Sequence, residues 1–220
     1  MSRLAALASV LLLASGVSAQ VPSPEAFLGY ALGERFTPHH RVVDYVTAVA
    51  EASPRVSMQV YGETPEGRPL IALVIAAEGV DTEAIRLSRL AAARGQGTPD
   101  RPVVWLSYNV HGNESVGTEA ALATLYTLAS GDPAETGLDR TVVVMDPCLN
   151  PDGRERYVSF YRQRRGAEAD LDPAGWEHRE PWPGGRSNHY LFDLNRDWAW
   201  GTQPETRARL PLYQAWRPSV

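Results

Sequence analysis

The chain is predicted to fold as an α/β domain with a mixed, mostly parallel central sheet flanked by helices. Helical and strand-like segments alternate along it, as they do when helices cover a sheet. Two apolar runs, Val103–Val110 and Thr141–Asp146, have the length and composition of strands buried on both faces. Two earlier strands are separated only by the turn Glu63–Gly67, so they must pair antiparallel and make the sheet mixed.

The individual elements follow from periodicity and from the residues that interrupt it. Asp81 is a helix-capping residue, Pro54 ends a helical pattern, and the prolines and glycines of Gly166–Ser187 predict a long surface loop. In order, we expect a helix at 37–52, strands at 55–61 and 70–77, a helix at 81–93, a strand at 103–110, a helix from 115 or 117 to 128, a strand at 141–146 and a helix at 205–215.

Composition is typical of one globular domain and excludes several kinds of function. The chain has 220 residues, 44% of them hydrophobic and 21% charged, which is enough to bury a full core. Its net charge of −5 gives no reason to expect a nucleic-acid partner. All 21 basic residues are arginine, so chemistry that requires a lysine is excluded within this segment. The single cysteine, Cys148, excludes an internal disulfide and a thiolate zinc site, and we expect it to be a buried apolar residue.

Residues 1–19 are predicted to be a secretory signal peptide. Arg3 provides the positive start, Leu4–Ala14 is an apolar run that is short for a membrane span, and small residues precede a cleavage site before Gln20. No later segment has the length of a transmembrane helix, so we expect no membrane partner beyond the export signal. The mature domain, residues 20–220, is therefore expected to be secreted or periplasmic.

The predicted strand at 103–110 leads into His111-Gly-Asn-Glu114, which has the residue types of a metal site. A neutral imidazole and a carboxylate on one turn can bind the same divalent cation, and Zn²⁺ favours that pairing. The motif alone is weak. His111 is otherwise a polar loop residue, and Glu114 an acid at the start of a helix, where the helix dipole favours it.

Further motifs follow in a fixed order and resemble those of the zinc carboxypeptidases, the carboxypeptidase A/B-like metallopeptidases. Gly67-Arg68 precedes the His-x-x-Glu motif, and an Asn-x-Asp-Gly loop follows it at 150–153. An arginine-rich patch around Arg162 comes next, and then the pair Asn195-Arg196. The resemblance covers residues 35–220 approximately.

The resemblance implies a role for each matched residue. His111 and Glu114 would bind catalytic Zn²⁺, with ligating atoms about 3 to 4 Å apart. Arg162 would stabilise the oxyanion, although Arg164 and Arg165 are close enough to shift the register, and the alternative is a solvated basic run.

Asn195 and Arg196 would bind the terminal carboxylate of a peptide or protein substrate. The alternative for Arg196 is an ion pair with Asp193 or Asp197. Asp152 would support the site, with a hydrogen bond to the ring nitrogen of His111 that faces away from the metal as one possibility. The remaining histidines are expected in loops or on the surface rather than as ligands: His39, His40, His178 and His189.

Three features of the family have no counterpart here: a third zinc ligand, which is a histidine, a general-base glutamate and a substrate-capping tyrosine. We therefore expect residues 20–220 to be the N-terminal part of a truncated catalytic domain, inactive and weak in zinc binding as a fragment. The predicted function is that of a zinc metallocarboxypeptidase. Two alternatives stay open: a metal-dependent amidase acting on cell-wall peptides or acylated amino acids, and a non-catalytic peptide-binding domain. The sequence does not indicate an oligomeric state.

Overall fold

The computed structural model describes residues 20–220, and the predicted signal peptide at 1–19 lies outside the described residues. The described part contains a four-stranded sheet in the order β1-β2-β4-β3. Strand β1 pairs antiparallel with β2, β2 pairs antiparallel with β4, and only β3 and β4 run parallel. The strands are β1 (Val56–Glu63), β2 (Pro69–Ile75), β3 (Val103–Ser107) and β4 (Val142–Asp146).

The expectation of a mostly parallel sheet is therefore wrong. Strand β2 does not stay at the edge with its hairpin partner but lies between β1 and β4, so its direction sets two of the three pairings. Only β3 and β4 are joined by the kind of helical crossover that brings two strands together in parallel.

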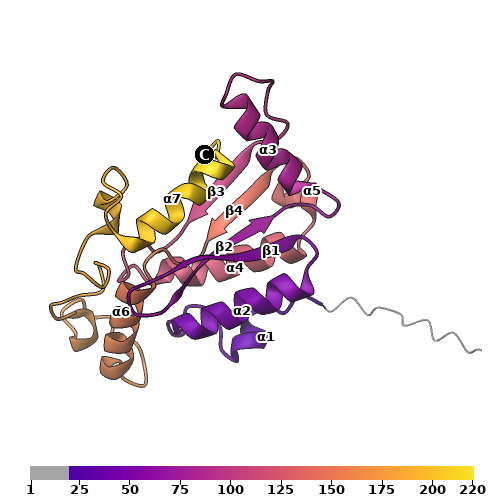
Figure 1. The fold of residues 1–220 in the computed structure, drawn as a ribbon. Coiled ribbons are helices and arrows are strands. Elements are labelled where there is room, and N and C mark those ends of the chain that lie inside the picture. The colour runs from indigo at the N-terminus through magenta and orange to yellow at the C-terminus, as the bar shows by residue number, and fades with distance from the viewer. Residues whose placement is uncertain (1–19) are drawn as a thin grey trace, which may run out of the picture.

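Helices cover both faces of the sheet, as Figure 1 shows. On β2, Leu73 and Ile75 belong to the core that packs against α1, α2 and α4, whereas Val74 packs with α3 and α7. Successive residues of a strand point to opposite faces, so an unbroken apolar run buries both. The helices are α1 (Pro24–Leu28), α2 (His39–Ala52), α3 (Thr82–Ala92), α4 (Val116–Ser130), α5 (Pro133–Thr136), α6 (Pro151–Arg164) and α7 (Pro204–Trp216), with 3-10 turns η1 (Trp176–His178) and η2 (Leu194–Arg196).

Helix α6 was not among the expected elements. Asn150 caps it by accepting a hydrogen bond from the backbone N–H of Gly153 at 3.0 Å, and Pro151 occupies the first turn, where its missing N–H costs nothing. What looks like a turn in Asn150–Gly153 is thus the start of a helix. The predicted strand at 103–110 also ends earlier, at Ser107, because Asn109 adopts a positive φ of 59°.

Two buried side chains fix α6 against the rest of the domain. The guanidinium of Arg154 pairs with the carboxylate of Glu119 on α4 at 2.7 Å, and both side chains are almost fully buried.

Cys148 is buried, as expected. His39, expected in a loop or on the surface, is instead buried at the start of α2. Within residues 20–220, no helix is both long and apolar enough to cross a membrane.

Candidate active site

His111 and Glu114 lie on the turn that connects β3 to α4, at the carboxyl end of the parallel strand pair. The backbone N–H of Glu114 donates to the carbonyl oxygen of His111 at 3.0 Å, which closes the turn. Asn109 reinforces it, because its side-chain amide donates to the same carbonyl at 2.6 Å. His111 is buried, whereas the side chain of Glu114 is 59% exposed, so this pair lies where the site opens to solvent.

Gly112 allows two other segments to approach this turn. A Cβ atom at Gly112 would lie 2.2 Å from the backbone N of Arg154 and 2.3 Å from the carbonyl oxygen of Gly185. Real Cβ atoms are not found at such distances, so only glycine fits. The start of α6 and the loop at Gly185 are therefore packed directly on the His111 turn.

Each ring nitrogen of His111 faces a carboxylate oxygen. Nδ1 lies 2.9 Å from Oε1 of Glu114, and Nε2 lies 3.1 Å from Oδ1 of Asp193. A neutral ring carries one N–H, and if Nε2 donates it to Asp193, Nδ1 presents a lone pair toward Glu114. Two lone-pair atoms face each other at this distance only with a proton or a cation between them. The arrangement has the donor set that zinc prefers.

The separation of these two atoms is consistent with a shared ion. Zinc bonds to nitrogen and oxygen are about 2.0 to 2.2 Å long, so two tetrahedral ligands stand about 3.3 to 3.6 Å apart, and the 2.9 Å observed would widen by about 0.4 to 0.7 Å when an ion binds. Among the described residues, we find no third histidine or carboxylate facing the same position. Asp193 is on the other side of the ring and supports His111 instead of completing the ligand set.

Asn195 and Arg196 lie on η2, directly after Asp193. The Oδ1 atom of Asp193 accepts from the backbone N–H of Asn195 at 2.9 Å while it contacts His111, so one carboxylate links this turn to the metal-ligand candidate. Both side chains are exposed. Among residues 20–220, Arg196 forms no ion pair with Asp193 or Asp197. The Asp197 carboxylate is engaged by Thr202 and Gln203.

Arg186, which none of the sequence motifs indicates, lies beside His111 and Asp193. Its guanidinium donates to Oδ2 of Asp193 at 3.0 Å, and its side chain is 48% exposed. Its carbonyl oxygen accepts from Asn150 at 3.1 Å, which fixes the backbone next to the His111 turn. Burial alone would raise the pKa of Asp193, but the hydrogen bonds from Asn195 and Arg186 outweigh it, and the pKa is lowered. Asp193 is therefore a carboxylate held in its charged form.

The structure does not bring Arg162 to this group. The first turn of α6 packs on Gly112, whereas Arg162 is exposed on the last turn of the helix. At a rise of about 1.5 Å per residue, the eight residues from Arg154 to Arg162 span roughly 12 Å along the axis. Neighbouring Arg164 stacks on Trp176 at 4.6 Å, and Arg165 binds the carbonyl oxygen of Glu34 at 2.6 Å.

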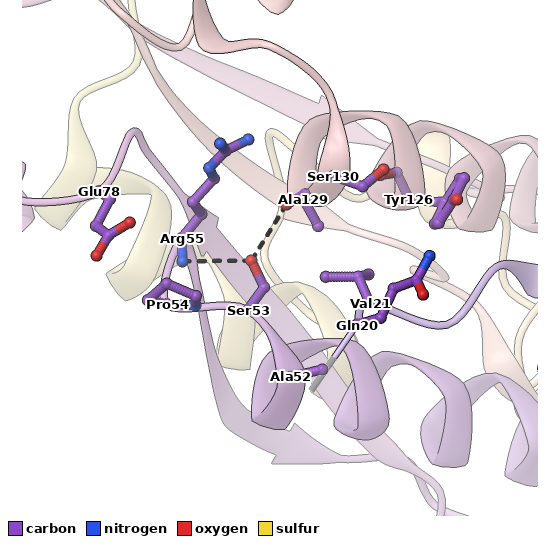
Figure 2. Close-up of a pocket in the computed structure, with 10 residues that line it drawn as sticks. All are labelled: Gln20, Val21, Ala52, Ser53, Pro54, Arg55, Glu78, Tyr126, Ala129 and Ser130. Carbon is purple, nitrogen blue, oxygen red and sulfur yellow. Dashed lines mark hydrogen bonds between the residues drawn. The ribbon is translucent and has the colours of Figure 1, made fainter. Parts of the chain in front are cut away.

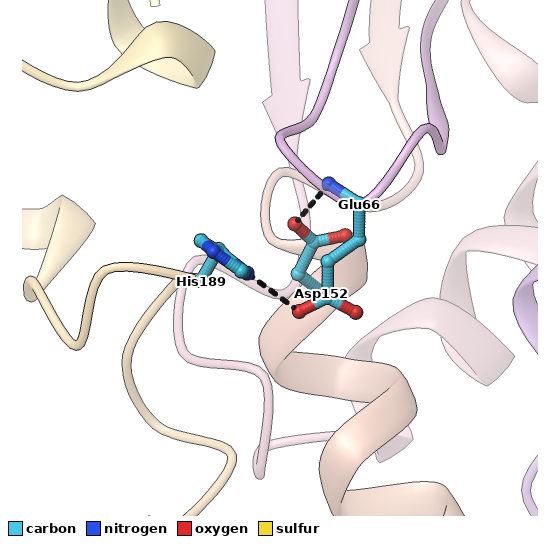
Figure 3. A group of neighbouring side chains, drawn as sticks. All are labelled: Glu66, Asp152 and His189. Atoms are coloured by element: carbon cyan, nitrogen blue, oxygen red, sulfur yellow. Dashed lines mark hydrogen bonds and ion pairs between the residues drawn. The ribbon is translucent and has the colours of Figure 1, made fainter.

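Asp152 does not contact His111, which differs from the expectation. Its buried carboxylate accepts from Thr64 at 2.7 Å and from Arg68 at 2.6 Å, so it ties the β1-β2 turn to the start of α6. Figure 3 shows it beside Glu66 and His189, which contact each other at 3.0 Å. These three residues have metal-binding atom types, but Arg68 already contacts both carboxylates at 2.6 Å, and its single positive charge offsets part of theirs.

A cavity away from His111 does not involve these residues. A cavity of about 490 Å³ lies between the ends of α2 and α4, lined by Ser53, Arg55 and Glu78 among others (Figure 2). Arg55 directly precedes β1, which pairs its first residue with the last residue of β2, Ile75. This cavity is therefore at the opposite end of the sheet from His111.

Comparisons with known proteins agree with the motifs. The family model for zinc carboxypeptidase matches residues 42–219. Mouse carboxypeptidase D is 36% identical over 156 residues, which cover 68% of this chain and 10% of the mouse protein. Carboxypeptidase E of Caenorhabditis elegans is 30% identical over 141 residues, which cover 62% of this chain and 24% of the nematode protein. The chain thus spans a quarter or less of these two relatives.

Solved structures show the same fold at lower identity. A metallo-carboxypeptidase from Burkholderia cenocepacia superposes with a TM-score of 0.51 at 23% identity, covering 80% of this chain and 37% of that protein. A metallo-carboxypeptidase from Pseudomonas aeruginosa, in complex with (2-guanidinoethylmercapto)succinic acid, gives a TM-score of 0.51 at 17% identity, covering 82% of this chain and 36% of that one.

Proposed function

Because this chain belongs to the zinc carboxypeptidase family, we propose that it provides part of the active site of a zinc metallocarboxypeptidase that hydrolyses the C-terminal peptide bond of peptides or proteins. The observation that carries this proposal is the Asp193 carboxylate. Its Oδ1 atom contacts His111 and also accepts from the backbone N–H of Asn195, which caps that turn. One residue thereby fixes the metal ligand and the carboxylate-binding turn relative to each other.

In the proposed site, Nδ1 of His111 and Oε1 of Glu114 would hold Zn²⁺, which would supply Lewis-acid chemistry and a more acidic water there. The role of Asp193 is to accept a hydrogen bond from Nε2–H of His111, which fixes the ring tautomer and strengthens its ligating nitrogen. A charged carboxylate performs this better than a neutral one, in accord with the lowered pKa of Asp193.

Residues 193–198, which we call the clamp turn, are proposed to bind the terminal carboxylate of the substrate. Arg196 offers two parallel N–H donors, which match the two oxygens of a carboxylate, and the amide of Asn195 offers a further donor. Neither side chain has a partner among the described residues that would compete for these donors. Binding the terminal carboxylate confines hydrolysis to the end of a chain.

We assign the oxyanion role to Arg186 instead of Arg162. Arg186 has a fixed backbone, a guanidinium anchored on Asp193 and nearly half of its side chain free to meet substrate. A guanidinium held in place before the reaction stabilises developing negative charge without reorganising. Arg162 offers none of these features, because it is exposed at the far end of α6.

The third zinc ligand and the general base are proposed to come from outside residues 20–220, as the family resemblance implies. Such a partition makes this chain a portion of the catalytic domain, weak in zinc binding and hydrolytically inactive by itself. We also propose that residues 1–19 are a signal peptide and that the mature protein is secreted or periplasmic.

Two measurements test the function. Calorimetric titration with zinc should show binding that is abolished by His111→Ala and by Glu114→Gln, while Glu78→Gln, at the opposite end of the sheet, leaves it unchanged. An assay of the complete zinc-loaded enzyme should release free amino acids from plain peptides. Release from cell-wall fragments alone would favour the amidase alternative. Binding of free-acid peptides with no turnover in the complete protein would favour the non-catalytic alternative.

A further inference from the structure

Arg209 is a fully buried charged residue on α7, directly behind the clamp turn. None of its three guanidinium nitrogens has a hydrogen-bond partner among residues 20–220. The other fully buried arginine, Arg154, donates to Thr37 and pairs with Glu119. Burying a guanidinium without hydrogen bonds is unfavourable, so the groups that Arg209 does contact indicate why a charge is placed there.

The guanidinium of Arg209 lies over the ring of Trp198, 4.2 Å from its centroid. Tyr213 meets the same ring edge-on, with centroids 5.8 Å apart. Arg209 and Tyr213 are four residues apart on α7, so they lie on one face of the helix and hold the indole together. A cation over an aromatic face is attracted to it more strongly when the cation is removed from water, as Arg209 is, while the Trp198 residue is 36% exposed.

Trp198 is the last residue of the clamp turn, two positions after Arg196. Asp193 holds the front of this turn through the backbone N–H of Asn195 at 2.9 Å. Between the two, Asp197 is buried and accepts from the backbone N–H of Gln203 at 2.9 Å. Asn195 and Arg196 thus project from a short turn anchored at both ends, by Asp193 in front and by the Arg209 stack behind.

A purely structural role for Arg209 also has support, and the experiment must separate the two. Asp146, at the end of β4, is fully buried and accepts from the hydroxyl of Tyr61 at 2.6 Å. Burial raises the pKa of Asp146, and the positive charge of Arg209 opposes this. Arg209 is therefore also the counter-charge of a buried carboxylate, a role that affects stability and not ligand selection.

We propose that Arg209 is a positioning residue for the substrate's terminal carboxylate: its stack on Trp198 sets the orientation of Asn195 and Arg196. The inference rests on the proposed function of the clamp turn and adds the residue that holds it. It requires selectivity for the free carboxylate to fall when the stack is removed, even in a folded protein.

The test is an equilibrium binding measurement on the metal-free 220-residue chain, so it does not depend on turnover. The ligands are a set of N-acetyl dipeptides that differ in their last residue, each as the free acid and as the C-terminal amide. In Arg209→Met, the ratio of acid to amide affinity should fall by about tenfold, as expected when an oriented charge-assisted contact is lost. Arg209→Lys, which keeps the charge and loses the planar stack, should restore the ratio only partly.

Trp198→Leu should lower the ratio and Trp198→Phe should keep it, which provides an answer if Arg209→Met does not fold. Trp216→Phe, a buried position on the same helix that packs against a different cluster, is the control for stability and should keep the ratio. Equal affinity for acid and amide in the wild type overturns the clamp itself, and the inference with it. The wild type could prefer the acid while folded Arg209→Met or Trp198→Leu keeps that full preference. This result would overturn the inference about Arg209 and leave the clamp turn as proposed.

Discussion

The carboxylate of Asp193 lies 3.1 Å from Nε2 of His111, on the side of the ring opposite Glu114. If Nε2 donates to this carboxylate, Nδ1 is the ring nitrogen with a free lone pair. Arg186 and the backbone of Asn195 contact the same carboxylate, at 3.0 and 2.9 Å. The three functions proposed for this site, metal binding, oxyanion stabilisation and carboxylate recognition, therefore share one anchor.

We predict that Asp193→Ala weakens zinc binding about 10- to 100-fold, because the ring of His111 loses the partner that fixes its tautomer. The zinc affinity of Asp193→Asn should lie between those of the wild type and Asp193→Ala, since its amide oxygen still accepts from Nε2. Zinc titration by calorimetry measures both. Asp132→Ala is a matched control, since Asp132 also caps a helical turn, at α5, away from the site. Unchanged zinc affinity in Asp193→Ala would show that His111 is oriented without it.

The oxyanion assignment is tested by comparing two arginines. In the complete zinc-loaded enzyme, Arg186→Ala should lower kcat about 10²- to 10³-fold, the usual loss for one preorganised donor. Arg162→Ala should leave kcat close to wild type. If Arg162→Ala lowered kcat and Arg186→Ala did not, the oxyanion role would belong to Arg162. The last turn of α6 would then have to lie closer to His111.

Much of the fold follows from apolar periodicity alone. The continuous runs of β2 and β4 are buried on both faces, and the helical spacing at 39–52 gives α2. The relative direction of the strands does not follow from periodicity, because the sequence contains no signal for which strand of the β1-β2 hairpin pairs with β4. Helix α6 had a readable signal, an Asn-Pro pair at a helix start, but Asp152-Gly153 directly after it is equally typical of a turn.

The site was only partly predictable for a similar reason. His111 and Glu114 are three residues apart, so local spacing brings them together. Arg186 and Asp193 reach His111 only because the loop after α6 returns to the turn at Gly112, and no local pattern encodes that return. The order of the motifs indicates Arg162, but this residue lies on the last turn of α6, whereas the first turn packs on Gly112.

The close packing at Gly112 provides a prediction about how the loop after α6 is held against the His111 turn. Gly112→Ala should destabilise the domain by about 1 to 3 kcal/mol, because the added methyl group meets backbone atoms of α6 and of Gly185 that cannot yield freely. It should also weaken zinc binding, since the turn must shift to relieve the contact. Gly166→Ala is the control, because its Cβ meets nothing closer than 3.5 Å and its φ is not positive. Thermal unfolding of both variants measures the difference, and equal melting temperatures would contradict the packing described here.

Asp146 predicts a dependence of stability on pH. Burial raises its pKa from 3.8 to about 6, so the folded state holds the proton more tightly than the unfolded chain does. The contribution of this group is therefore largest at low pH, falls as pH rises from about 4 to about 6, and is constant above that. Asp146→Asn keeps an acceptor for Tyr61 and removes the titration. Unfolding free energies measured across this range, for the variant and the wild type, should differ by a pH-dependent amount, and a constant difference would contradict the buried carboxyl.

Arg196 distinguishes a carboxypeptidase from a general amidase. In the complete enzyme, Arg196→Ala should cost about 2 to 5 kcal/mol of transition-state binding, seen mainly as lost kcat/KM, because the substrate's terminal carboxylate loses its bidentate partner. Zinc content should not change, since the side chain of Arg196 contacts neither His111 nor Glu114 among the described residues. The loss should be confined to free-acid peptides, because a peptide with an amidated terminus never forms this ion pair. If the wild-type enzyme cleaved both peptides equally well, Asn195 and Arg196 would not bind the terminal carboxylate of the substrate. The amidase alternative would then explain the site better.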